Sequence, residues 1–248
     1  METSAPGTVK ERIADTLDAL DKARRGIAVY VLLVLGLSVA CFFAAEPILN
    51  VLIRLLGRKL VAYNPAEGFL ALASLALYCG ITLSIPAGAW MLWRAATARW
   101  IPEWRRWGTP VIAIATALFV SGILLGYFVL LPAGIGFLVG FESEEVRALI
   151  SARRFISFCG MMMLALGFSF EAPLVSFFLA RIGWLKPSFF RDRWRHAILF
   201  CTVMAAVITP TPDVYNMTLM TMPLLGLYFV SFAVVWVADR RRKPPRAG

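Results

Sequence analysis

Long apolar runs separated by short charged segments make up most of this sequence. The long runs cover approximately residues 27–45, 68–93, 110–131, 155–180 and 214–237, and a shorter one covers 196–209. A helix needs about 20 apolar residues to cross the hydrocarbon core of a bilayer. The pattern therefore predicts an all-α polytopic membrane protein with six transmembrane helices. The fifth, with about 14 apolar residues, would span only roughly 21 Å.

The segments outside the apolar runs are too short for a soluble domain. We expect an N-terminal segment at 1–26, a membrane domain at 27–237 and a basic tail at 238–248. Residues 10–25 alternate apolar and charged positions at helical spacing, which predicts an amphipathic helix on the inner membrane surface. The sequence "EPILNVLIRLLG" in the outer loop 46–67 predicts a second such helix, with Pro47 in its first turn. A short helix is also expected in the outer loop 132–154.

The positive charges indicate how the chain is oriented. The protein has 248 residues and a formal net charge of +10. The segments that would share one side with both termini hold 19 of the 25 Lys and Arg residues, and the other side holds six. Cytoplasmic segments carry the excess of Lys and Arg, so both termini are expected in the cytoplasm. The terminal "RRRKPPR" is interpreted as a basic stop beside anionic lipid rather than an RNA-binding segment, so no nucleic-acid partner is expected.

Few side chains are suited to catalysis. His196 is the sole histidine, which excludes the HExxH zinc motif and most catalytic triads, and it is expected to be an interfacial anchor. The four cysteines lie within apolar runs without CxxC spacing. The sequence therefore predicts a non-enzymatic protein without a catalytic site, metal or cofactor.

One acidic residue lies deep in an apolar run. Glu171 occurs in "LALGFSFEAPLVSFF", residues 164–178, two positions before Pro173. Burying an ionisable group in a membrane costs several kcal/mol, so such a residue is a candidate functional group. Pro173 removes a backbone hydrogen bond and should kink the helix. Two interpretations remain open: a wet, concave functional surface, or a protonated glutamic acid bonded to a neighbouring helix.

Several motifs, taken in order along the chain, resemble the TatC family, the receptor subunit of the twin-arginine protein translocase. They are "LSIP" at 83–86, Trp93, "GYFVLLP" at 126–132, "FSFEAP" at 168–173 and "TPTPD" at 209–213. The resemblance implies a curved, cup-like six-helix bundle whose last two helices are short. Its concave face would hold a membrane-buried glutamate, which matches Glu171.

The resemblance also implies a function. Family members recognise the twin-arginine signal peptides of folded precursors at the cytoplasmic face of the bacterial or archaeal cytoplasmic membrane. They pass these precursors across with TatA/TatB-type single-span partners, driven by the proton-motive force. Self-association into a homo-oligomer is left open.

Signal-peptide recognition in the family uses two surface carboxylates, and this chain departs from the pattern at both. Asp21 falls on the first acidic position, where the neighbouring histidine and first arginine of the motif are lost. In "IPEWRR", residues 101–106, Trp104 replaces the second glutamate, and Glu103 precedes it. We expect signal-peptide binding at Asp21, Glu103, Trp104, Arg105 and Arg106. Alternatively, Glu103 only pairs with the adjacent arginines.

Other motif positions divide between the membrane and its outer face. The intramembrane group, expected to receive partner helices, is Glu171, Pro173 and Tyr127. The outer-face group is Glu67, Phe69, Pro132 and Asp213. Four polar positions of the family pattern have become apolar or small here, namely Ser74, Met91, Met217 and Phe229.

These departures keep a second hypothesis open, a TatC-like scaffold that no longer reads twin-arginine signals. A small-molecule secondary transporter is a third hypothesis, although inverted repeats are expected in such folds and no internal self-similarity is evident here.

Overall fold

The described part of the chain in this computed structural model comprises residues 9–56, 60–61, 63–99, 102–139, 151–208 and 214–240, and it is almost entirely helical. The helices are α1 (Val9–Phe43), α2 (Ala45–Leu56), α3 (Pro65–Arg99), α4 (Gly108–Leu125), α5 (Leu131–Val139), α6 (Ala152–Phe170), α7 (Ala172–Ile182), α8 (Pro187–Ile208) and α9 (Val214–Arg240). A 3₁₀ turn, Pro102–Trp107, precedes α4, and a π-helical turn, Gly126–Leu130, joins α4 to α5.

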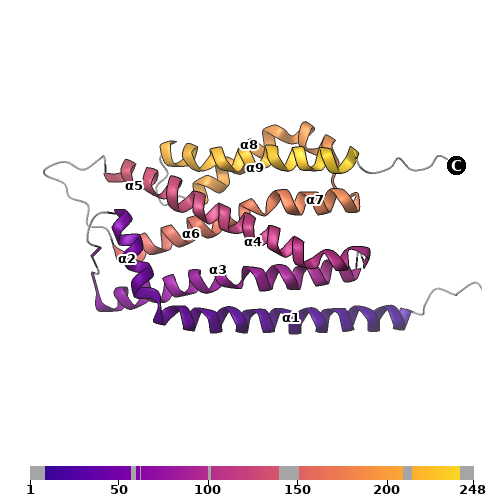
Figure 1. Ribbon diagram of the computed structural model, residues 1–248, viewed down its shortest axis with the longest axis horizontal. Helices are drawn as coiled ribbons and strands as arrows, with labels where there is room; N and C mark the ends of the chain where they lie inside the picture. Colours follow the sequence, from indigo (N-terminus) through magenta and orange to yellow (C-terminus); the bar gives the residue numbers. More distant parts are fainter. Residues whose placement is uncertain are drawn as a thin grey trace, which may run out of the picture.

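Among the described residues, five helical stretches are long and apolar enough to cross a membrane. They are Arg24–Phe43, Ala66–Thr97, Gly108–Gly136, Ala152–Ile182 and Val214–Arg240. The prediction of an all-α polytopic membrane protein is therefore confirmed. Figure 1 shows the long helices packed side by side, with the start of α1 and the finish of α9 at one end. We call this the basal end, and the opposite end, where α2 lies, the apical end.

α8 begins well before the apolar run that was expected to form the fifth span. It starts at Pro187, a residue whose fixed φ and missing N–H suit the first turn of a helix. It has 22 residues, which corresponds to roughly 33 Å along its axis. Backbone angles at Arg193 (φ −115°, ψ 16°) interrupt its regular geometry. The basic segment at 187–195, expected to be loop, is thus part of the helix.

α1 runs without a break from Val9 to Phe43. The expected amphipathic helix at 10–25 is therefore continuous with the first span and is not a separate surface element. The joining segment contains no proline, and its single Gly26 costs only about 1 kcal/mol in a helix. The second amphipathic helix is confirmed as α2, with Pro47 as its third residue. The helix expected within 132–154 falls largely on 140–150, outside the described residues.

Two proline positions distort the long spans in different ways. Before Pro173, α6 ends at Phe170 and α7 begins at Ala172, so the predicted interruption is present at Glu171. Before Pro132, the chain widens into the π-helical turn, where the Leu131 N–H donates to the Gly126 carbonyl. Pro132 has no N–H to donate to the preceding turn, and the wider π-helical turn accommodates this missing hydrogen bond. The helix therefore continues beyond Pro132 as α5.

Glycines bring the helices into close contact. A Cβ at Gly80 on α3 would lie 2.2 Å from Ser38 Oγ on α1. On α4, a Cβ at Gly122 would lie 2.7 Å from the Leu166 carbonyl oxygen of α6. Small residues of this kind allow membrane helices to approach closely enough for dispersion contacts to hold them together.

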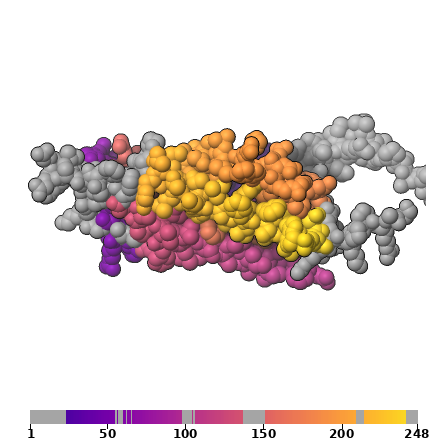
Figure 2. Space-filling model, turned by 90° about the horizontal axis from the view of Figure 1, so that it is seen from above, coloured from indigo at the N-terminus to yellow at the C-terminus, as the bar shows by residue number. Residues whose placement is uncertain are grey.

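The buried side chains form two clusters. The larger lies towards the apical end, and Leu131, Ile156, Leu166 and Met220 are among its most buried members. The smaller joins α7, α8 and α9 through Ala180, Phe190, Val235 and Ala238. In the view of Figure 2, α8 and α9 lie side by side across one face of the molecule. The two clusters leave hollows on either side of the α6–α7 helix.

Candidate functional site

Glu171 lies in a groove between α1, α3, α4 and the α6–α7 helix. The groove encloses about 510 Å³ and is lined mainly by apolar side chains, with Tyr30, Trp93, Phe119 and Phe178 among them. We call it the Glu171 groove. Its walls come from segments more than 100 residues apart in the sequence, so only the packing of the helices creates it.

The carboxyl group of Glu171 has an unused hydrogen-bonding position. The backbone of this residue is satisfied, because its N–H donates to Phe168 O at 3.2 Å and its carbonyl accepts from Val175 N at 3.0 Å. Its Oε1 atom is buried and has no hydrogen-bond partner among the described residues. A buried polar atom without a partner is costly, so the groove favours a ligand that donates a hydrogen bond to Glu171.

Trp93 supplies a second unpartnered polar atom on the same groove. Its Nε1 is buried without a hydrogen-bond partner in the described part of the chain. The indole ring is fixed by Phe178, with the ring centroids 4.9 Å apart. Gly108 leaves space for this ring, because a Cβ there would lie 3.0 Å from Trp93 Nε1. The Trp93 ring therefore forms part of the apolar wall of the groove, and Glu171 is the acidic residue among the lining residues.

Tyr30 fixes α1 against α3 beside this groove. Its hydroxyl lies 2.9 Å from Ser84 Oγ, and Ser84 in turn donates to the Ile81 carbonyl at 2.7 Å. Gly88 gives the ring its space, since a Cβ there would lie 2.9 Å from the Tyr30 hydroxyl. Tyr30 was not predicted as a site residue from the sequence, where its signal is a single hydroxyl-bearing ring within an otherwise apolar run.

The 3₁₀ turn at the basal end is held against α7 by Trp104. This half-buried ring lies 6.2 Å from the rings of Phe177 and Phe178, and the Arg181 guanidinium lies 5.0 Å from its centroid. Arg106 is exposed. Trp104 therefore packs as an anchor at the position where the family pattern has a surface acid.

The other residues expected to bind a signal peptide lie at the same end of the molecule. Glu103 and Arg105 belong to the 3₁₀ turn, and Asp21 belongs to α1; the side chains of these three lie outside the described part of the structure. Figure 1 places the start of α1 and the connection between α3 and α4 at the basal end.

The apical residues form a separate group. Glu67 accepts hydrogen bonds from the Tyr63 N–H, at 2.9 Å, and from the Ser151 hydroxyl, and Ser151 caps α6 by accepting from the Arg154 N–H. The exposed ring of Phe69 lies 5.8 Å from Phe42 at the end of α1. Glu67 and Phe69 thus join the start of α3 to neighbouring helices.

The remaining expected site residues do not line the Glu171 groove together. Pro173 is buried at the start of α7. Tyr127 packs against the apical cluster, with its ring 4.9 Å from that of Phe128. Pro132 is exposed on α5, and Asp213 lies outside the described residues.

The comparisons with known proteins give one consistent result. Residues 18–223 match the family described as Sec-independent protein translocase protein (TatC). The TatC protein of Deinococcus radiodurans is 33% identical over 193 residues, which cover 75% of this chain and 72% of that protein. The chloroplastic TATC protein of Pisum sativum is 28% identical over 226 residues, 90% of this chain and 64% of that protein. The crystal structure of the twin arginine translocase receptor TatC superposes with a TM-score of 0.80 at 27% identity, covering 89% of this chain and 99% of that chain.

Proposed function

This chain belongs to the TatC family, and we propose that it is the core subunit of a twin-arginine translocase that binds signal peptides of folded precursors at its basal end. The single observation that carries the proposal beyond family membership is the Glu171 groove, an apolar hollow with a buried, unpartnered carboxyl oxygen. Such a surface suits recognition of another helix. The protein then acts by binding and transport.

We propose that the basal end faces the cytoplasm of a bacterial or archaeal cell and that α8 is the fifth of six spans. The excess of Lys and Arg in the basal segments supports this orientation. The apolar part of α8 beyond its charged first turns covers only roughly 20 Å, less than a hydrocarbon core of about 30 Å, so in this proposal the bilayer is locally thinner beside α8.

In this proposal, the Glu171 groove receives a TatA/TatB-type single-span helix. A polar side chain on the partner helix would donate to Glu171 Oε1, which has no partner of its own in the described chain. One turn of a helix about 10 Å wide occupies roughly 420 Å³, so the groove of about 510 Å³ fits the contact face of a single turn. The contact would therefore be local and reversible.

The groove proposal is tested with substitutions at Glu171. Glu171→Ala removes the acceptor, and the net value of a hydrogen bond, about 0.5–1.5 kcal/mol, predicts a roughly two- to tenfold loss of crosslinking to the partner helix. Glu171→Gln keeps an acceptor oxygen and should retain part of the contact. Crosslinking is measured from a photoreactive residue at Val175, which lines the same groove.

A matched control lies two residues away. The Ser169 hydroxyl donates to the Ala165 carbonyl of its own helix at 2.7 Å, and the residue lines the hollow on the opposite side of α6–α7. Ser169→Ala should leave partner crosslinking unchanged. If Glu171→Ala also leaves crosslinking unchanged, the groove does not bind the partner helix through this carboxyl group.

Signal-peptide recognition is tested at the basal carboxylates. Asp21→Ala and Glu103→Ala should each weaken crosslinking to a twin-arginine precursor, because an arginine guanidinium pairs with a carboxylate by charge-assisted hydrogen bonds. Unchanged crosslinking in both variants removes the proposed recognition site.

The packing of Trp104 supports a second candidate function, a scaffold that binds partners without reading twin-arginine signals. The ring occupies the family's acidic position and is held by Phe177, Phe178 and Arg181. Expression in a strain lacking its own TatC, together with matching partners, separates the two. Export of a twin-arginine reporter that is abolished by changing both arginines to lysine supports the translocase, whereas partner binding without export supports the scaffold.

A further inference from the structure

A second hollow lies on the opposite side of the α6–α7 helix, between α7, α8 and α9. It encloses about 560 Å³. On the α6–α7 helix, Ser169, Ala172 and Ser176 line it, whereas Glu171 lines only the other groove. We call it the α8 hollow. None of the proposed partner-helix or signal-peptide residues whose side chains are described lines it.

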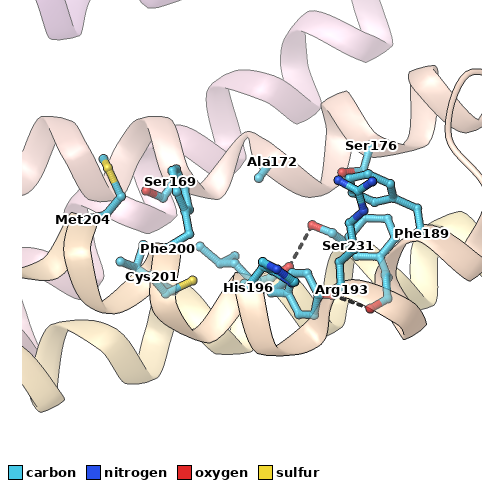
Figure 3. Close-up of a pocket in the computed structure, with 15 residues that line it drawn as sticks. Ser169, Ala172, Ser176, Phe189, Arg193, His196, Phe200, Cys201, Met204 and Ser231 are labelled. Atoms are coloured by element: carbon cyan, nitrogen blue, oxygen red, sulfur yellow. Dashed lines mark hydrogen bonds between the residues drawn. The ribbon is translucent and has the colours of Figure 1, made fainter.

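The α8 hollow has a charged end and an apolar end. Figure 3 shows Arg193 and Ser176 together at one end, and Phe200, Met204 and Ser169 at the other. His196 lies between the two ends. A ligand that fits this arrangement has an anionic group joined to a long apolar part.

The positive charge of the hollow is not neutralised by the described protein. No carboxylate is among its lining residues. The neighbouring Asp192 lies 3.6 Å from Arg191, and both side chains are exposed. Arg193 instead rests on an aromatic ring, with its guanidinium 4.9 Å from the centroid of Phe189. Its hydrogen-bond donors therefore remain available for an anion.

The charged end lies at the depth expected for lipid headgroups. α7 carries Arg181 in its last turn and α9 ends at Arg240, whose guanidinium lies 3.5 Å from the ring of Trp236. Arg195 similarly lies 5.5 Å from the ring of Trp194 on α8. Tryptophan and arginine gather at the boundary between hydrocarbon and headgroups. Further along α8, away from the basal end, the exposed side chains are apolar and include Leu199, Val203 and Val207.

We propose that the α8 hollow binds one anionic phospholipid from the basal leaflet of the membrane. Arg193 and His196 hold the phosphate, and one acyl chain lies along Phe200, Met204 and Leu224. The Tyr228 hydroxyl, which donates to the Phe190 carbonyl at 2.6 Å, ties α9 to α8 beneath the headgroup. The lipid would fill the space that the kinked α8 leaves open beside α7 and α9.

The composition of the hollow, with one basic end and one apolar end, favours a lipid over a protein helix. The wall residues Phe200 and Met204 also have exposed side chains, so an acyl chain could reach the hollow past them.

The proposal is tested by native mass spectrometry of the full chain released from detergent. The probes are phosphatidylglycerol and phosphatidylcholine with identical acyl chains. Phosphatidylglycerol should be retained in a one-to-one complex and phosphatidylcholine should not. Loss of one basic group near a membrane surface costs about 1 kcal/mol, so Arg193→Ala should reduce this retention about fivefold.

Three comparisons make the test specific. Arg191→Ala removes an equal charge outside the hollow and should leave retention unchanged. Met204→Trp fills the apolar end and should reduce retention even though both basic groups remain. Inorganic phosphate at millimolar concentration should not displace the lipid, which distinguishes a phospholipid from a free-phosphate site. The unfolding temperature of each variant without lipid shows whether it is folded.

The proposal is overturned if Arg191→Ala and Arg193→Ala lose lipid equally among folded variants, or if both lipids are retained alike. It is also overturned if inorganic phosphate displaces the lipid. A photoreactive residue at Phe200 gives an independent result in native membranes: crosslinks to lipid support the proposal, and crosslinks to a single-span protein contradict it.

Discussion

Two glutamates within the helical spans have opposite surroundings. Both carboxylate oxygens of Glu67 accept hydrogen bonds, one from the Tyr63 N–H and the other from the Ser151 hydroxyl. Glu171 has a buried oxygen with no partner among the described residues. A carboxylate whose two oxygens both accept hydrogen bonds stabilises the fold. A carboxylate with an oxygen that accepts none has a hydrogen-bonding position left for a ligand. This contrast is consistent with a framework role for Glu67 and supports the proposal that Glu171 contacts a partner helix.

Glu67→Gln should therefore lower the unfolding temperature of the detergent-solubilised protein. The substitution replaces one of the two acceptor oxygens with an NH2 group, which cannot accept a hydrogen bond. Either the contact to the Tyr63 N–H or the contact to the Ser151 hydroxyl is then lost. Ser151→Ala should have a similar effect, and the double variant should lose less than the sum of the two single changes because the residues share one interaction.

The control is Glu46→Gln, which removes an exposed carboxylate in the first turn of α2. It should leave the unfolding temperature nearly unchanged. Additive losses for Glu67→Gln and Ser151→Ala would show that the two side chains stabilise the apical end independently.

At the scale of helices, contacts between backbones set the spacing of the bundle. α4 and α6 touch where Gly122 faces the Leu166 carbonyl, and Gly167 next to it gives space to the Phe119 ring. In lipid, helix association depends on close packing and interhelical contacts rather than on burial of apolar surface from water. Small residues at these crossings therefore matter more than the hydrophobicity of either helix.

Gly122→Ala is expected to destabilise the protein by about 1–3 kcal/mol, the typical cost of overpacking a core. The added Cβ would lie 2.7 Å from a backbone carbonyl oxygen, which cannot rotate away as a side chain can. The free energy of unfolding in mixed micelles measures this loss. Gly226→Ala on α9 is the matched control, because no heavy atom lies within 4 Å of its added Cβ. Equal stability of the two variants would contradict a tight α4–α6 contact.

Across the whole molecule, the connections between helices gather at two ends with different charge. The start of α1, the 3₁₀ turn and the finish of α9 lie at the basal end, and α2 lies at the apical end (Figure 1). The basal segments contain most of the Lys and Arg residues. This asymmetry is the basis for placing the basal end in the cytoplasm.

The orientation is tested with single cysteines in a chain whose four native cysteines are replaced by alanine. Asn64→Cys at the apical end should react with a membrane-impermeant maleimide in intact spheroplasts. Arg106→Cys at the basal end should react only after permeabilisation. Both native side chains are exposed, so accessibility to solvent does not bias the comparison. Reaction of Arg106→Cys in intact spheroplasts would reverse the proposed orientation.

The amino-acid sequence by itself determined the membrane-spanning architecture, because the length and polarity of an apolar run are local properties. It also determined the break in the fourth span, since Pro173 cannot donate the backbone hydrogen bond that a continuous helix requires. The start of α8 was predicted wrongly. Hydropathy placed it at the beginning of the apolar run, near residue 196, because the residues before that run are charged, whereas the helix begins at Pro187.

Only the tertiary structure decided which distant residues meet. Glu67 and Ser151 are 84 positions apart, and Tyr30, Trp93 and Glu171 share a groove because α1, α3 and α6–α7 pack around it. The α8 hollow arises in the same way, from the separation of α7, α8 and α9. The geometry of helix packing depends on side-chain shape at many crossings at once, so no local pattern in the sequence specifies these sites.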